Sequence, residues 1–151
     1  MSKVTTTMAG LPHLVGSEVG VSDWLPVDQE VISAFGRLTR DEQWIHLDPD
    51  RAASGPFGST IAHGYLTLSL LSGLFMDVLE VSDATAGVNY GLNKVRFPAP
   101  LPVDSRVRAR ISLLSVDPIE GGLQMLVEAV IEREGGDKPV CVAQPIFRYY
   151  Q

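Results

Sequence analysis

The hydrophobic positions of this chain follow helical spacing in its first half and strand-like alternation in its second. Between Ile61 and Leu79 the apolar side chains lie nearly all round a helix, which predicts a helix buried on most sides. Polar residues interrupt this run, and it barely reaches the roughly 20 apolar residues that a membrane span requires. We therefore expect the central helix of a soluble domain, beginning at about Ala62, and no association with a membrane.

Four strand-like runs follow that helix, at residues 87–97, 106–116, 123–132 and 139–150. Apolar and polar residues alternate most regularly in the second and third runs, as in strands with one buried face. Glycine pairs between the later runs predict turns. In the first run the alternation changes phase near Asn93-Lys94, which indicates a β-bulge. Pro145 lacks the N–H that a sheet needs, so the last run must lie at an edge or adjoin a bulge.

The N-terminal part of the chain carries weaker signals. Residues 1–16 have no clear period and fit either a loose arm or a short packed helix, with His13 at the surface. Residues 20–25 fit a short first strand. Asp28 is a typical N-cap for an amphipathic helix that ends near Thr39, and Asp48-Pro49 is a typical start for a second, short helix.

This order of elements predicts an α+β fold. A single long helix wrapped by a curved antiparallel meander, the hotdog fold, satisfies both hydrophobic patterns over one domain of residues 1–151. Such a sheet leaves an edge strand with unpaired backbone groups, and pairing the edges of two subunits is one way to satisfy them. We therefore expect a homodimer.

Composition narrows the class of protein. The net charge of −6 argues against a nucleic-acid binder, because binding phosphates needs a basic surface. Cys141 is the single cysteine, so no internal disulfide forms, and its apolar surroundings in the sequence predict a small buried hydrophobic residue. The N-terminus lacks the continuous apolar segment of a signal peptide, so we expect a cytoplasmic protein.

Asp41 and His46 are the candidate chemical pair. Residues five apart on a regular helix point roughly 140° away from each other, so the chain between them must leave the helix if they are to converge. The pair also has ordinary interpretations, as a turn aspartate and a half-buried packing histidine. Together with His63 it could supply metal ligands, but the spacing matches no standard ligand pattern, and we expect no metal.

His63-Gly64 precedes the central helix and has two interpretations. Gly64 could simply allow the start of the helix to pack tightly against the sheet. Alternatively, the free N–H groups and the dipole of a helix N-terminus favour negative charge, and a glycine lets a ligand approach them closely. An enolate-like thioester oxygen would be stabilised at such a place.

Residues 35–71, FGRLTRDEQWIHLDPDRAASGPFGSTIAHGYLTLSLL, resemble the signature of the MaoC-like dehydratases, which include the (R)-specific enoyl-CoA hydratases. Two departures from that signature are Arg40 in place of glycine, and Gln43-Trp44 in place of Asn-Pro. We expect them to alter the turn between the pair or the mouth of the pocket. The positions that carry the resemblance are Phe35, Thr39, Asp41, Ile45, His46, Ala52 and His63-Gly64.

The resemblance implies a reversible, cofactor-free hydration of trans-2-enoyl-CoA to (3R)-hydroxyacyl-CoA. Asp41 would take a proton from water as it attacks C3, and His46 would orient that water and help to deliver a proton to C2. The Gly64 N–H would stabilise the thioester oxygen, and His63 would lie beside the substrate. The resemblance also implies an acyl chain along the central helix and a CoA tunnel at the junction of two hotdog units.

Positive charge for the CoA phosphates could come from Lys94, Arg96, Arg106 and Arg108, and the alternative is that these residues form a solvated face of the sheet. On the first interpretation, Arg106 and Arg108 would serve the active site of the neighbouring subunit. Two alternative functions fit the same fold: an acyl-CoA thioesterase, and a non-catalytic acyl-binding or assembly subunit. The intact Asp41/His46 pair argues against the second alternative.

Overall fold

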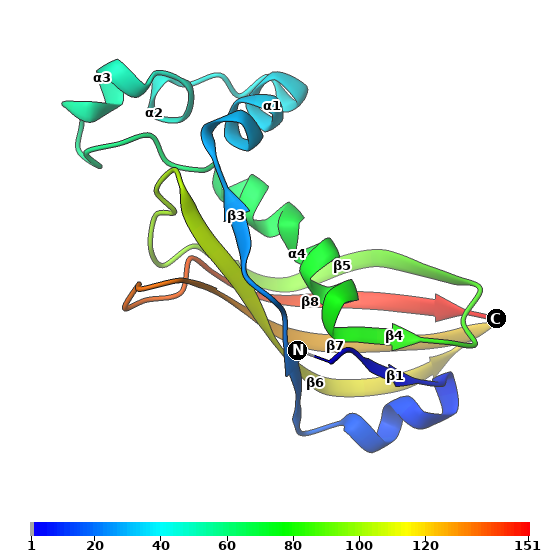
Figure 1. The fold of residues 1–151 in the computed structure, drawn as a ribbon. Coiled ribbons are helices and arrows are strands. Elements are labelled where there is room, and N and C mark those ends of the chain that lie inside the picture. Colours follow the sequence, from blue (N-terminus) through cyan, green and yellow to red (C-terminus); the bar gives the residue numbers. More distant parts are fainter. Residues whose placement is uncertain (1) are drawn as a thin grey trace.

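The computed structural model describes residues 2–151, in which a curved antiparallel sheet wraps around one long helix (Figure 1). This is the α+β arrangement that the sequence predicts. The elements, in chain order, are β1 (Val4–Thr6), the 3-10 helix η1 (Met8–Leu14), β2 (Glu18–Val21), β3 (Leu25–Val27), α1 (Gln29–Thr39), α2 (Trp44–Leu47), α3 (Pro49–Ala53), α4 (Gly64–Val78), β4 (Leu79–Val81), β5 (Ala86–Arg96), β6 (Ser105–Ile119), β7 (Gly122–Arg133) and β8 (Cys141–Tyr150).

The main sheet has the strand order β2-β6-β7-β8-β5, and β3 also pairs with β6. The predicted four-strand meander is therefore wrong for its first strand, because β5 pairs with β8 rather than with β6. The connection after β5, residues 97–104, is long enough to carry the chain to the distant strand β6, so neighbours in sequence are not neighbours in the sheet. This leaves β5 at an edge.

The register of the sheet agrees with the alternation in the sequence. The side chains of β6 that point toward α4 are fully buried, and they are Val107, Ala109, Ile111 and Leu113. The predicted bulge is present as a shift in the β5–β8 register between Leu92 and Val95. Pro145 pairs with Leu92 beside this bulge in an interior strand, so the bulge rather than an edge position accommodates it.

The helix α4 differs from its prediction on one side. Leu66, Leu71, Leu74, Phe75 and Val78 are buried against the sheet. The opposite face is open, with Tyr65 73% and Met76 59% exposed. The expectation that α4 is buried on most sides is therefore wrong for a single chain, because the sheet curves around only part of the helix.

The N-terminal segment is packed, with Met8 and Leu11 of η1 buried. The predicted strand at 20–25 is replaced by β2 and β3, which are separated by residues 22–24. The parallel pair β1–β4 was not predicted, because each strand has only three residues. Asp28 and Asp48 cap α1 and α3 as expected. None of the described helices is long and apolar enough to cross a membrane.

Candidate active site

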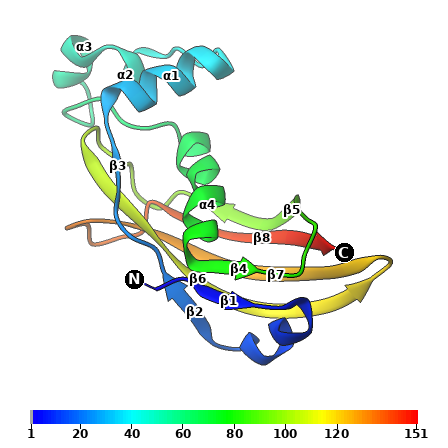
Figure 2. The same cartoon turned by 45° about the vertical axis from the view of Figure 1, so that its right-hand side comes forward.

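Three short helices, α1, α2 and α3, gather at the N-terminal end of α4, beyond the curved sheet (Figure 2). Helix α1 ends at Thr39, and its C-cap residue Arg40 has a left-handed φ of 62°, which turns the chain sharply. Asp41 follows this turn, and α2 then carries His46 back toward it. A carboxylate oxygen of Asp41 and ring nitrogens of His46 and His63 all lie within 4.8 Å of one another. The chain thus leaves the helix between Asp41 and His46, as their convergence requires.

His46 is buried and its tautomer follows from its contacts. Its Nδ1 lies 2.6 Å from the main-chain oxygen of Ile61. A carbonyl oxygen can only accept, so Nδ1 carries the hydrogen and Nε2 of the neutral ring keeps a free lone pair. Burial lowers the pKa of His46 below its ordinary value of 6.5; the Ile61 hydrogen bond and the Asp41 carboxylate oppose this shift, and the neighbouring His63 adds to it. His46 is therefore set up as a neutral acceptor.

His63 lies behind His46 and is only 2% exposed. The two rings stack with centroids 3.8 Å apart and an interplanar angle of 24°. The Nε2 of His63 donates to the main-chain oxygen of Asp41, 2.8 Å away, and its Nδ1 has no hydrogen-bond partner among the described residues. This residue therefore connects both members of the candidate pair, a relationship that its position in the sequence does not reveal.

Three further polar residues, Gln29, Thr60 and Gln43, make hydrogen bonds around the pair. The Gln29 amide donates to the main-chain oxygen of His46 at 2.8 Å, and its own oxygen accepts from Thr60 Oγ1 at 2.5 Å. Gln43 donates to the Asp41 carboxylate at 3.4 Å. Gln43 is one of the departures from the family signature, and here it contacts the predicted catalytic carboxylate directly. Nothing in the sequence singled out Gln29 or Thr60, because their contacts join distant segments.

A pocket of about 350 Å³ opens beside His46, and Asp41 is not among the residues that line it. His46 and Gly64 contribute to its wall, as do Phe57, Thr67, Phe97 and Leu101. A Cβ at Gly64 would lie 3.1 Å from the Phe97 ring, so this glycine permits the close packing that was one of its two interpretations. His63, the N-cap residue of α4, makes no side-chain capping bond, which leaves the first N–H groups of α4 free to meet a ligand.

The donor atoms of Asp41, His46 and His63 are close enough to be considered as a metal site. Their orientation does not suit one. The two imidazole rings are stacked and nearly parallel, so their lone pairs lie in two separate planes, whereas the ligands of a metal ion converge on it. The absence of a metal requirement stays a prediction, now with a geometric reason.

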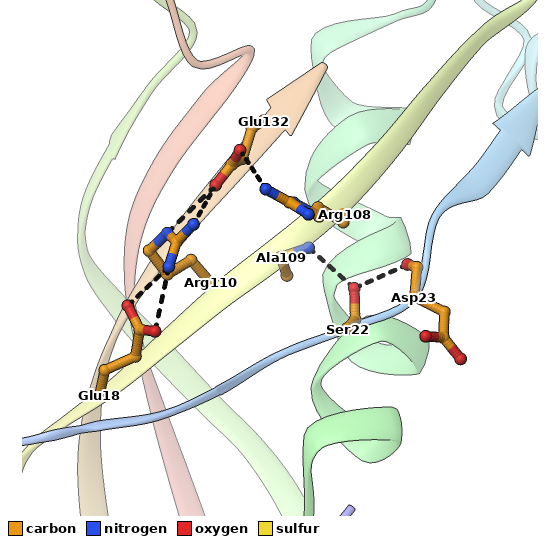
Figure 3. Close-up of polar contacts among 7 residues, drawn as sticks. All are labelled: Glu18, Ser22, Asp23, Arg108, Ala109, Arg110 and Glu132. Carbon is orange, nitrogen blue, oxygen red and sulfur yellow. Dashed lines mark hydrogen bonds and ion pairs between the residues drawn. The ribbon is translucent and has the colours of Figure 1, made fainter. Parts of the chain in front are cut away.

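The four candidate phosphate-binding residues fall into two groups. Arg106 and Arg108 pair with Glu134 and Glu132, each at 3.2 Å, and Arg108 also stacks over Trp24. Figure 3 shows Arg108 within an ion-pair network on β6 and β7 that continues through Arg110 to Glu18. These arginines alternate with buried residues of β6, so they lie on the sheet face turned away from α4.

Lys94 and Arg96 differ from Arg106 and Arg108. Both are exposed on the edge strand β5, and neither forms an ion pair with any described residue. Arg96 donates to the main-chain oxygen of Val95. Of the four candidates, these two have charge that is not already neutralised by a neighbouring carboxylate.

The comparisons with known proteins agree with this fold. The MaoC like domain family matches residues 11–134. A Mycobacterium tuberculosis protein named 3-hydroxyacyl-thioester dehydratase Z is 51% identical over 144 residues, which is 95% of either chain. A monoamine oxidase regulatory protein from Archaeoglobus superposes with a TM-score of 0.78 at 20% identity, covering 100% of this chain and 99% of the other. R-hydratase PhaJ1 from Pseudomonas aeruginosa superposes with a TM-score of 0.71 at 20% identity, covering 91% and 82%. The predicted hotdog fold is confirmed.

Proposed function

The chain belongs to the MaoC-like domain family, and from this premise we propose that it is an enzyme that reversibly hydrates trans-2-enoyl-CoA to (3R)-hydroxyacyl-CoA. The observation that carries the proposal is the meeting of the Asp41 carboxylate with His46, whose Nε2 is free to accept, beside a pocket that contains the N-terminus of α4. The name of the mycobacterial relative, a 3-hydroxyacyl-thioester dehydratase, supports the same reaction in its reverse direction.

In the proposed hydration, one water lies between Asp41 and His46. Both groups accept hydrogen bonds, which directs the oxygen lone pair of the water toward C3. Asp41 takes a proton as the C3–O bond forms, and the pair returns that proton to C2, with His46 passing it through Nε2. General acid–base catalysis of this kind is typically worth about 10²–10⁴-fold. No cofactor enters this scheme.

The thioester oxygen gains negative charge while C2 is a carbanion. The Gly64 N–H at the start of the 15-residue helix α4 is the proposed donor to it. Since Gly64 lines the same pocket as His46, one bound thioester could reach both. Removing such an oxyanion donor typically costs about 10²–10³-fold in kcat.

The acyl chain is proposed to follow α4. Two grooves, of about 470 and 320 Å³, run between α4 and β5 and share Ser72, Asn89 and Phe147. Both are lined mainly by apolar side chains, which suits a hydrocarbon tail. A series of enoyl-CoA substrates of increasing chain length tests this placement. If hydration rates are insensitive to chain length, the acyl group does not occupy these grooves.

A second copy of the chain is the proposed partner. The open face of α4, the edge strand β5 and the residue after it together expose large apolar side chains: Tyr65, Met76, Val88, Tyr90, Leu92 and Phe97. Exposed apolar surface on an unpaired edge is typical of an interface. Sedimentation should give a dimer, and a fully active monomer would exclude this proposal.

Lys94 and Arg96, on β5, are the proposed ligands of the CoA phosphates.

Crotonyl-CoA separates this function from its two alternatives. A hydratase removes the enone absorbance without releasing a thiol, whereas a thioesterase releases free CoA. A non-catalytic acyl-binding subunit binds the ester and leaves it unchanged. The hydratase proposal expects enone loss, no thiol, and (3R)-hydroxybutyryl-CoA as the product.

A further inference from the structure

His63 is a buried histidine that the proposed reaction does not use. It stands between the end of α1 and the start of α4, and it touches both members of the pair. Its ring stacks on His46, and its Nε2–H donates to the main-chain oxygen of Asp41. Its exposed fraction of 2% leaves no surface for a substrate to contact. His63 therefore lies behind the Asp41/His46 pair rather than beside the substrate, where the resemblance had placed it.

The packing around His63 is tight on the side of α1. The Phe35 ring lies 5.1 Å from the His63 ring, centroid to centroid. A Cβ at Gly36 would be 3.4 Å from His63 Cε1 and 3.0 Å from the Asp41 carbonyl oxygen. The main-chain oxygen of His63 accepts from the Thr67 N–H in the first turn of α4. The ring is therefore held by Phe35 of α1, by the Asp41 loop and by His46 of α2, while the bond to Thr67 fixes the His63 main chain at the start of α4.

We propose that His63 is a positioning residue, which holds the Asp41 main chain by hydrogen bonding and the His46 ring by stacking so that carboxylate and Nε2 face one water. This inference rests on the proposed function and deepens it. The two contacts act on different members of the pair, so a loss of either misplaces one group relative to the other. A misplacement of about 1 Å at a reacting centre can cost about 10²-fold in rate.

The stack also bears on the protonation of His46. The titratable groups that face His46 are Asp41, from the loop after α1, and His63, from the segment before α4; a charge on His63 disfavours a charge on His46. Replacing His63 by a side chain that cannot take up a proton removes this effect and therefore raises the pKa of His46. In a plot of activity against pH, the decline on the acid side should therefore move to higher pH in such a variant.

Two substitutions of His63 test its two proposed contacts separately. His63→Phe keeps a ring against His46 and loses the donor to Asp41, while His63→Gln keeps an amide donor and loses the stack. With crotonyl-CoA, each should lower kcat by about 10- to 100-fold with KM within about threefold of wild type. His13→Gln, which changes an exposed histidine in η1, is the matched control and should leave both constants unchanged.

Nitrogen NMR of the histidine rings supplies a readout that needs no activity. In the wild-type protein, His46 should be the Nδ1–H tautomer and His63 the Nε2–H tautomer, and the pKa of His46 should rise in His63→Phe. The opposite tautomers in wild type, or folded His63 variants with unchanged kcat and His46 pKa, would overturn the proposal. If wild type hydrates no enoyl thioester, the proposed function fails, and the tautomers and the His46 pKa still decide this inference.

Discussion

The Nδ1–H of His46 donates to the main-chain oxygen of Ile61 across 2.6 Å, a contact that joins α2 to the segment leading into α4. This bond fixes which nitrogen of the ring is free. It also lets the ring be buried without an unsatisfied donor, because the hydrogen of the neutral ring is already paired. The chemistry proposed for the site depends on this tautomer.

The first prediction concerns pH. Burial lowers the pKa of His46 in the folded protein below 6.5, so the unfolded chain binds a proton more readily than the folded one. The stability that His46 contributes by remaining neutral is complete above pH 6.5 and is lost as pH falls toward its folded-state pKa. Thermal melting between about pH 5 and 8 should show Tm falling on the acid side. His46→Gln should flatten this decline, and an equally steep decline in that variant would contradict the assignment.

Arg40 provides a test of backbone strain. It occupies a left-handed conformation with φ 62°, where the family signature has glycine. A side chain in this region costs roughly 1–2 kcal/mol, part of which is offset because glycine gains more freedom in the unfolded chain. Arg40→Gly should therefore raise the free energy of unfolding by up to about 1 kcal/mol, measured by denaturant titration. Arg37→Gly, inside α1, should lower it by about the same amount. Stabilisation by both or by neither would contradict this account of the turn.

Gly36 is expected to tolerate no side chain. A Cβ there would lie 2.8 Å from Leu47 Cδ1 and 3.0 Å from the carbonyl oxygen of Asp41. Gly36→Ala should cost about 1–3 kcal/mol of stability by overpacking and should also reduce kcat, because relief of the clash moves Asp41. Arg37→Ala, one residue later on an exposed face of the same helix, should change stability by no more than about 0.5 kcal/mol. A fully active, fully stable Gly36→Ala protein would show that this contact does not hold Asp41.

Metal dependence is the fourth test. The near-parallel rings of His46 and His63 do not converge on a common point, so activity should survive exhaustive chelation unchanged. Activity measured before and after dialysis against a chelator, with a divalent-ion supplement as the control, decides this. Loss with the chelator and recovery with the ion would show that the cluster binds a metal after all.

Local patterns in the sequence predicted the elements well where a short-range physical rule applies. The cap at Asp28, the alternation in β6 and the bulge before Val95 all depend on residues close in sequence. The pairing of β5 with β8 was missed because it joins strands that are separated by β6 and β7 in the chain. The open face of α4 was missed because a helix that is apolar all round looks the same whether its cover comes from its own sheet or from another molecule.

In the candidate site, too, features set by residues close in sequence were predictable and features set by distant segments were not. The convergence of Asp41 and His46 could be anticipated from the resemblance to the MaoC-like signature, and it required the chain between them to leave the helix. The stacking of His63 and the support from Gln29 could not, since both arise from tertiary contacts between distant segments. The ion pairs of Arg106 with Glu134 and of Arg108 with Glu132 were also not visible, because each pair joins β6 to the neighbouring strand β7 or to the residue directly after it.

The Asp41/His46 pair is the central claim, and single-residue variants assayed with crotonyl-CoA test it most directly. Asp41→Asn keeps the shape of the side chain and His46→Gln replaces the ring by a neutral polar side chain, so circular dichroism should match wild type. Wild type should remove the enone without releasing thiol, and each variant should lower kcat by at least about 10²-fold. Near wild-type hydration by either folded variant would contradict the account.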